Sequence, residues 1–131
     1  MADAEYAAVC IGSSAGTGKA AVDELRRRGV KAGLVKIRAF RPFPAEAIAR
    51  ALQNVKAVAI MDKTDSFSAC GGPLGAEVRA ALYHHGVTAP AANFVYGLGG
   101  RDVRVDDFYE IFRVLQEGKD FPVFQYIGVR E

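Results

Sequence analysis

The sequence is poor in cysteine and carries almost no net charge, and both shortages restrict the functions that it can have. Its 131 residues include two cysteines, Cys10 and Cys70. Two cysteines so far apart form neither a metal site nor a disulfide framework, so a reducing cytoplasm is the expected compartment. The formal net charge is +2, from 17 Lys and Arg against 15 Asp and Glu. This near-balance argues against a nucleic-acid partner held by phosphate contacts.

Long apolar runs are also missing. No stretch approaches the roughly 20 residues that a membrane-spanning helix needs, and no apolar stretch opens the chain as in a signal peptide; we therefore expect no membrane partner. Half of the residues are hydrophobic, and the length suits one domain over residues 1–131. The charged residues 2–5 run directly into an apolar stretch, and we expect the chain to be excised from a longer polypeptide.

Apolar runs alternate with segments of helical periodicity, which is typical of βαβ units. A turn is expected at 12–16. Strands are expected at 6–11, 32–37, 57–61 and 91–96, and helices at 17–28, from Pro44 onward, at 73–85 and at 106–116. Continuous apolar strands joined by helices predict a three-layer α/β/α fold with a mainly parallel sheet of four to five strands. The apolar tail at 121–129 is expected either to add an edge strand or to dock on a neighbour.

The conspicuous motifs all follow strands of the predicted sheet. In open α/β sheets, ligands and partners gather beyond the carboxyl ends of the strands. Glycines, prolines and basic residues concentrate there, in the segments 12–19, 38–44, 62–72 and 97–102. The sequence therefore predicts that this edge is the functional surface.

The first of these segments, Gly12 to Lys19, has glycines and hydroxyls before a helix, as a phosphate cradle does. The P-loop pattern fails, because Gly12 and Gly18 are six apart instead of five and Ala20 replaces the Ser or Thr that binds magnesium. The dinucleotide pattern is weak as well, since no acid closes the second strand. We expect a tight strand-to-helix turn, and the alternative is an independent nucleotide- or anion-binding module.

No other segment supplies a complete catalytic set. Asp62 ends a strand, but the acids of a magnesium site are missing after the first strand, so we expect a surface pair with Lys63 or a contact with a partner. Cys70 precedes a helix, where thiol pKa values fall, but Ala76 stands where an anion loop needs Arg. The pair His84–His85 is expected to be a solvated helix end.

The same motifs resemble those of the pyruvate:ferredoxin oxidoreductase family. The blocks are residues 33–44 (GLVKIRAFRPFP), Asp62-Lys63 followed by Ser66-Phe67 and 71–74 (GGPL), and 97–102 (GLGGRD). The resemblance covers almost the whole chain. It points to the second domain, which is similar to the transketolase C-terminal domain and ends the alpha subunit of multi-subunit members.

The resemblance implies a non-catalytic assembly domain of a 2-oxoacid:ferredoxin oxidoreductase, with pyruvate as the favoured substrate. Such complexes decarboxylate the oxoacid with coenzyme A and pass electrons through iron–sulfur clusters to ferredoxin. Thiamine diphosphate and magnesium are expected in other domains or subunits, which would be the partners, and no cofactor is expected here. The candidate interface residues are Arg38, Phe40, Arg41, Phe43, Asp62, Lys63, Phe67, Arg101 and Asp102.

Overall fold

The computed structural model describes residues 3–11, 14–37, 44–63, 73–96, 104–118 and 125–126. Strands and helices alternate along them, which confirms the predicted succession. In chain order the elements are β1 (Tyr6–Ile11), α1 (Ser14–Arg27), β2 (Ala32–Ile37), α2 (Ala45–Leu52), β3 (Ala57–Lys63), α3 (Pro73–His84), β4 (Ala91–Tyr96), α4 (Val105–Glu117) and β5 (Gln125–Tyr126).

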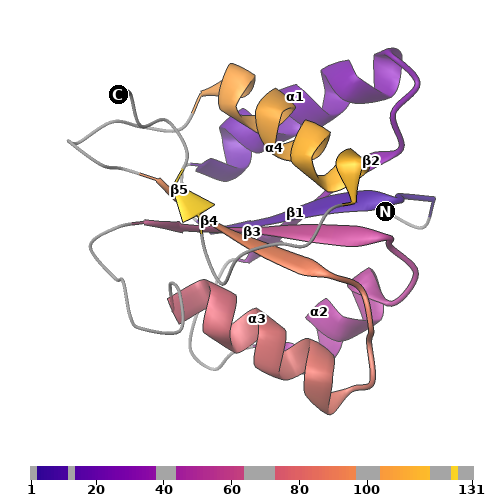
Figure 1. Cartoon of the computed structure of the whole chain (residues 1–131), viewed down its shortest axis with the longest axis vertical. Coiled ribbons are helices and arrows are strands. Elements are labelled where there is room, and N and C mark those ends of the chain that lie inside the picture. Colours follow the sequence, from indigo (N-terminus) through magenta and orange to yellow (C-terminus); the bar gives the residue numbers. More distant parts are fainter. Residues whose placement is uncertain are drawn as a thin grey trace.

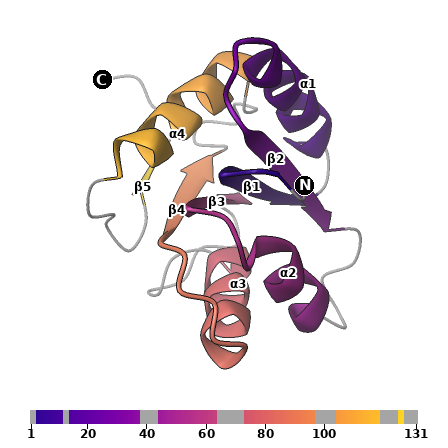
Figure 2. The same cartoon turned by 90° about the vertical axis from the view of Figure 1, so that its right-hand side faces the viewer.

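The strands form one five-stranded sheet in the order β2-β1-β3-β4-β5. Each neighbouring pair is parallel. Helices α1 and α4 cover one face of this sheet, and α2 and α3 cover the other (Figure 1, Figure 2). The predicted three-layer α/β/α fold with a parallel sheet is thereby confirmed. The chain direction across the sheet reverses at β1, because β2 lies on one side of it and β3 on the other.

The sheet separates two apolar cores, and alternate strand residues enter each of them. In β3, Ala59 and Met61 pack in the core under α1 and α4, whereas Val58 and Ile60 pack in the core above α2 and α3. This alternation is the two-residue period of a strand. Both faces of β3 are buried, which explains why its sequence is continuously apolar rather than alternating.

Helix α1 begins at Ser14, so the helix start predicted at Thr17 is wrong. The turn predicted for 12–16 is wrong for residues 14–16, and residues 12 and 13 lie outside the described part. A glycine inside a helix costs about 1 kcal/mol relative to alanine, which made this segment look like a turn. Close packing explains Gly18. A Cβ there would lie 3.0 Å from Leu34 Cδ1 and 3.1 Å from Phe108 Cζ, so glycine lets α1 approach β2 and α4.

The other element boundaries follow the sequence closely. Three helices are followed by glycines with positive φ, Gly29 at +89°, Gly86 at +72° and Gly118 at +67°, the conformation in which glycine commonly ends a helix. Strand β3 extends two residues beyond the prediction, because Asp62 and Lys63 still pair with β4.

The tail contributes an edge strand. Its described residues, Gln125 and Tyr126, pair in parallel with Phe94 and Val95 of β4. This pairing confirms the edge-strand interpretation for those two residues, and the rest of 121–129 lies outside the described part. Among the residues that the structure describes, no helix combines the length and the apolar character that crossing a membrane requires.

Candidate functional site

The carboxyl ends of the first four strands lie along one edge of the sheet, because those strands are parallel. Ile11 pairs with Ile37 at the ends of β1 and β2, and Lys63 pairs with Tyr96 at the ends of β3 and β4. The last residues of these four strands therefore lie at the same edge of the sheet.

Most of the predicted interface residues lie in the segments that follow these four strands. These interface candidates fall outside the described residues, so their role stays a prediction. Gly12, Ser13 and Cys70 also lie outside the described residues, and for Lys63 the structure describes the backbone alone. The interface candidates concerned are Arg38, Phe40, Arg41, Phe43, Phe67, Arg101 and Asp102.

Asp62 is the candidate whose side chain is described, and it is buried, with 5% of its surface exposed. Its Oδ1 accepts a hydrogen bond of 2.9 Å from the backbone N–H of Leu74. Its Oδ2 accepts one of 2.7 Å from the N–H of Gly75 and one of 3.0 Å from Nδ2 of Asn93. The expectation of a surface pair with Lys63 is wrong, because the carboxylate bonds within the domain. We call Asp62, Leu74, Gly75 and Asn93 the carboxylate clamp.

The carboxylate clamp closes the connection between β3 and α3. Leu74 and Gly75 lie in the first turn of α3, where backbone N–H groups have no partner within the helix and the helix dipole favours a negative charge. Asp62 satisfies two of these groups. Since Asp62 also belongs to β3, one carboxylate ties the end of β3 to the start of α3.

Asn93 is the member of the clamp that sequence reasoning missed. It is fully buried in β4, and its Nδ2 donates to the Ile60 carbonyl at 3.0 Å as well as to Asp62. A signal for it exists in the sequence. Asn interrupts the otherwise apolar strand 91–96 (AANFVY), and a buried amide must find hydrogen-bond partners nearby.

Two residues of α3 fit closely against this network. A Cβ on Gly75 would lie 2.4 Å from Oδ1 and 2.6 Å from Cγ of Asn93, so a residue without a side chain is required there. One turn later, Nη2 of Arg79 donates to the Ala91 carbonyl at 3.1 Å. Burial lowers the pKa of Arg79, and the charge of Asp62 opposes this shift; the guanidinium stays charged at any pH in ordinary use.

The carboxylate clamp is chemically saturated. Within the described ranges, no buried side-chain nitrogen or oxygen lacks a hydrogen-bond partner. Asp62 occupies the N-terminus of α3, so an anionic ligand finds no free N–H groups at Leu74 and Gly75. The geometry thus suits Asp62 to holding the N-terminus of α3 against β3 and β4, and not to acid–base chemistry.

The alternative anion cradle at Gly12–Lys19 is not favoured by the geometry. Gly16 and Gly18 are helical residues of α1 rather than loop glycines. Lys19 is turned to solvent, where its Nζ lies 3.5 Å from Oδ2 of Asp23. A helix whose glycine serves packing against Phe108 and Leu34 explains this segment without a ligand.

The remaining candidate side chains lie apart from the carboxylate clamp. Cys10 is buried in β1. His84 and His85 are exposed at the end of α3, as expected of a solvated helix end, with ring centroids 5.0 Å apart. The described residues contain no group of three or more His, Cys, Asp or Glu side chains placed to hold a metal ion.

Comparison of the sequence with known proteins shows the family to which the chain belongs. Residues 4–108 match the family described as "Pyruvate:ferredoxin oxidoreductase core domain II". The pyruvate synthase subunit PorA of Thermotoga maritima is 40% identical over 132 aligned positions, which cover 100% of this chain and 33% of that protein. The ketoisovalerate oxidoreductase subunit VorA of Pyrococcus abyssi is 40% identical over 121 positions, which cover 89% of this chain and 30% of that protein.

A third relative has a different electron partner in its name. The alpha subunit of the NADH-dependent phenylglyoxylate dehydrogenase of Aromatoleum evansii is 40% identical over 115 positions, which cover 88% of this chain and 27% of that protein. The chain thus spans about a third of the length of the curated relatives that it matches.

Proposed function

Because the chain belongs to the pyruvate:ferredoxin oxidoreductase core domain II family, we propose that it is the non-catalytic assembly domain of a 2-oxoacid:ferredoxin oxidoreductase. The observation that carries this proposal is the carboxylate clamp. The carboxylate of the buried Asp62 already accepts hydrogen bonds from three N–H groups of the domain itself. The clamp holds the ends of β3 and α3 in place, and a docking surface needs such rigid supports.

The parent complex would carry out the coenzyme A-dependent oxidative decarboxylation of a 2-oxoacid in the cytoplasm. Pyruvate is the favoured substrate, since several relatives are named as pyruvate synthase subunits. Thiamine diphosphate, magnesium and iron–sulfur clusters would be held in other domains or subunits, as the family resemblance implies. The partners would be the thiamine-binding domains or subunits, with ferredoxin as the electron acceptor of the whole complex.

The docking surface would consist of the segments 38–44, 64–72 and 97–102. Phe40, Phe43 and Phe67 would supply apolar anchors, and Arg38, Arg41, Lys63 and Arg101 would supply directed polar contacts, a combination common at interface centres. The residues that precede the second and third of these segments, Lys63 and Tyr96, are paired at the ends of β3 and β4. Fixed loop ends reduce the entropy lost on docking.

The test is co-purification. The tagged chain, produced together with the other subunits of the oxidoreductase from its organism, should bring the thiamine-binding subunit with it. Phe43→Ala and Arg101→Ala should each weaken this association. Arg27→Ala, on an exposed turn of α1, is the matched control and should leave the association unchanged.

The isolated chain provides the second half of the test. We expect it to show no 2-oxoacid oxidation and to bind no thiamine diphosphate in calorimetry. Turnover by the chain alone would overturn the proposal. A 1:1 isotherm with coenzyme A or an adenine nucleotide would favour the independent binding module instead.

A further inference from the structure

Helix α3 is apolar on two opposite sides. Its inner side contributes Leu74, Val78 and Leu82 to the core above α2 and α3. At 100° per residue, Ala76, Ala80 and Tyr83 cluster on the reverse side. Tyr83 is 89% exposed, and among the described residues it is the large hydrophobic side chain left in water. The polar residues Glu77, Arg79 and His84 lie between these two sides, so α3 has a second apolar stripe that the core of this domain does not cover.

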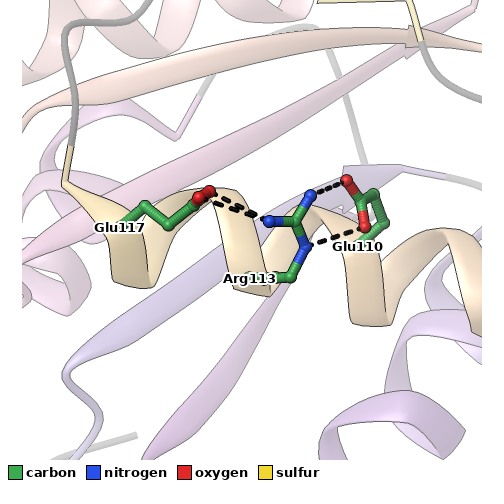
Figure 3. Close-up of polar contacts among 3 residues, drawn as sticks. All are labelled: Glu110, Arg113 and Glu117. Atoms are coloured by element: carbon green, nitrogen blue, oxygen red, sulfur yellow. Dashed lines mark hydrogen bonds and ion pairs between the residues drawn. The ribbon is translucent and has the colours of Figure 1, made fainter.

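The outer faces of the helices in the opposite layer look different. In α4, Arg113 pairs with Glu110 and, at 3.0 Å, with Glu117 (Figure 3). In α1, Lys19 pairs with Asp23 at 3.5 Å. Helix faces that this domain turns to water thus carry intrahelical ion pairs, whereas the outermost positions of α3 are two alanines and a tyrosine.

A hollow of about 260 Å³ lies beside Tyr83. Its walls are Arg79, Leu82 and Tyr83 of α3 together with the segment 87–91 that leads into β4. Arg79 is anchored there by its bond to the Ala91 carbonyl, and burial lowers its pKa. An arginine already partly dehydrated and an exposed tyrosine beside a hollow are the residues that most often dominate binding energy at interfaces.

We propose that this face, made of Ala76, Arg79, Ala80 and Tyr83 with the hollow beside them, packs against another domain of the same oxidoreductase. The partner segment is apolar and carries a carboxylate toward Arg79. The proposal rests on the proposed function and adds a second contact, on the outer side of α3 rather than at the carboxyl edge of the sheet.

Two observations identify the occupant. The matching subunits are about three times as long as this chain, so two thirds of such a subunit lies outside it and is available to cover the face. The charge at the hollow is that of Arg79, whose guanidinium is permanently positive. An apolar segment with a carboxylate fits both the stripe and this charge, because docking would remove the remaining water from Arg79 and a dehydrated charge needs a paired acid.

A photo-cross-linker at position 83 tests the proposal in the assembled complex. p-Benzoylphenylalanine replaces Tyr83 in the tagged chain, the complex is purified and irradiated, and the linked peptides are identified by mass spectrometry. The same amino acid at Gln116, exposed on α4, is the matched control. We expect position 83 to link several-fold more than position 116, to an apolar, acid-containing segment of an oxidoreductase subunit outside residues 1–131.

The possible results separate this inference from the proposed function. If the oxidoreductase subunits co-purify but position 83 links no more than position 116, the second contact is refuted and the assembly role stands. Links between two copies of residue 83 alone would show that a second copy covers the face, and would also refute it. If no oxidoreductase subunit co-purifies, the proposed function fails, and this inference with it.

Substitutions at Tyr83 give an independent measurement. Tyr83→Ala should weaken the association by about thirtyfold, a usual size for truncation of an interface aromatic, while Tyr83→Phe should retain it. The melting temperature of the isolated chain should be the same for both variants, because Tyr83 is exposed there. Equal association of Tyr83→Ala and the unmodified chain would overturn the inference.

Discussion

Replacing Asp62 by asparagine tests the carboxylate clamp directly. The substitution keeps the shape of the side chain, but it removes the charge and replaces one acceptor oxygen by a donor NH2 group. The aspartate accepts three hydrogen bonds, one at Oδ1 and two at Oδ2. An asparagine in either orientation turns its NH2 group toward at least one N–H donor, so at least one buried donor loses its partner.

The expected cost follows from that count. In the better orientation the NH2 group faces Leu74, and one hydrogen bond to a charged acceptor is lost, which is worth about 1.5–3 kcal/mol. Loss of the negative charge at the N-terminus of α3 adds about 0.3–1 kcal/mol. We therefore expect the free energy of unfolding to fall by about 3 kcal/mol, a large fraction of the stability of one domain.

Urea unfolding of the isolated chain at pH 7, followed by far-ultraviolet circular dichroism, measures this change. The matched control is Asp23→Asn, which removes an exposed carboxylate whose side chain is 51% accessible, and which should cost under about 0.5 kcal/mol. If Asp62→Asn costs no more than Asp23→Asn, the clamp does not hold α3 and the reasoning is refuted.

Further predictions concern the glycines and the exposed ion pairs. Gly75→Ala places a Cβ 2.4 Å from Oδ1 of Asn93 and should destabilise the domain by about 1–3 kcal/mol. Gly16→Ala places a Cβ with nothing within 4 Å and should stabilise the domain by about 0.5–1 kcal/mol. Equal effects of the two substitutions in urea unfolding would contradict the packing argument. The hydrogen bond and the charge of Arg113 lower the pKa of Glu110 from its ordinary 4.5. The stability that this pair contributes is therefore present above pH 4.5 and is lost as the pH falls through the lowered value. The difference in unfolding free energy between the unmodified chain and Glu110→Gln should shrink below that pH, and a difference that stays constant down to pH 3 would count against the pair.

The amino-acid sequence by itself determined the fold class and most element boundaries. Parallel strands that are buried on both faces are continuously apolar, and the runs 32–37 and 91–96 can be recognised as strands from that property. Helix ends marked by Gly29, Gly86 and Gly118 were equally visible, because positive φ is a local demand that glycine meets. The family motifs were visible for the same reason, since a motif is a matter of order and spacing along the chain.

Only the tertiary structure decided what Asp62 does. Its partner Asn93 is 31 positions away, and nothing local to either residue says that β3 and β4 lie side by side at that register. The same holds for the packing of Gly18, because no local pattern indicates that Leu34 and Phe108 lie against it. It holds also for the outer face of α3, whose apolar character matters because both sides of that helix cannot face one core. Contacts between distant segments depend on strand order, and strand order is a property of the whole fold rather than of any stretch of sequence.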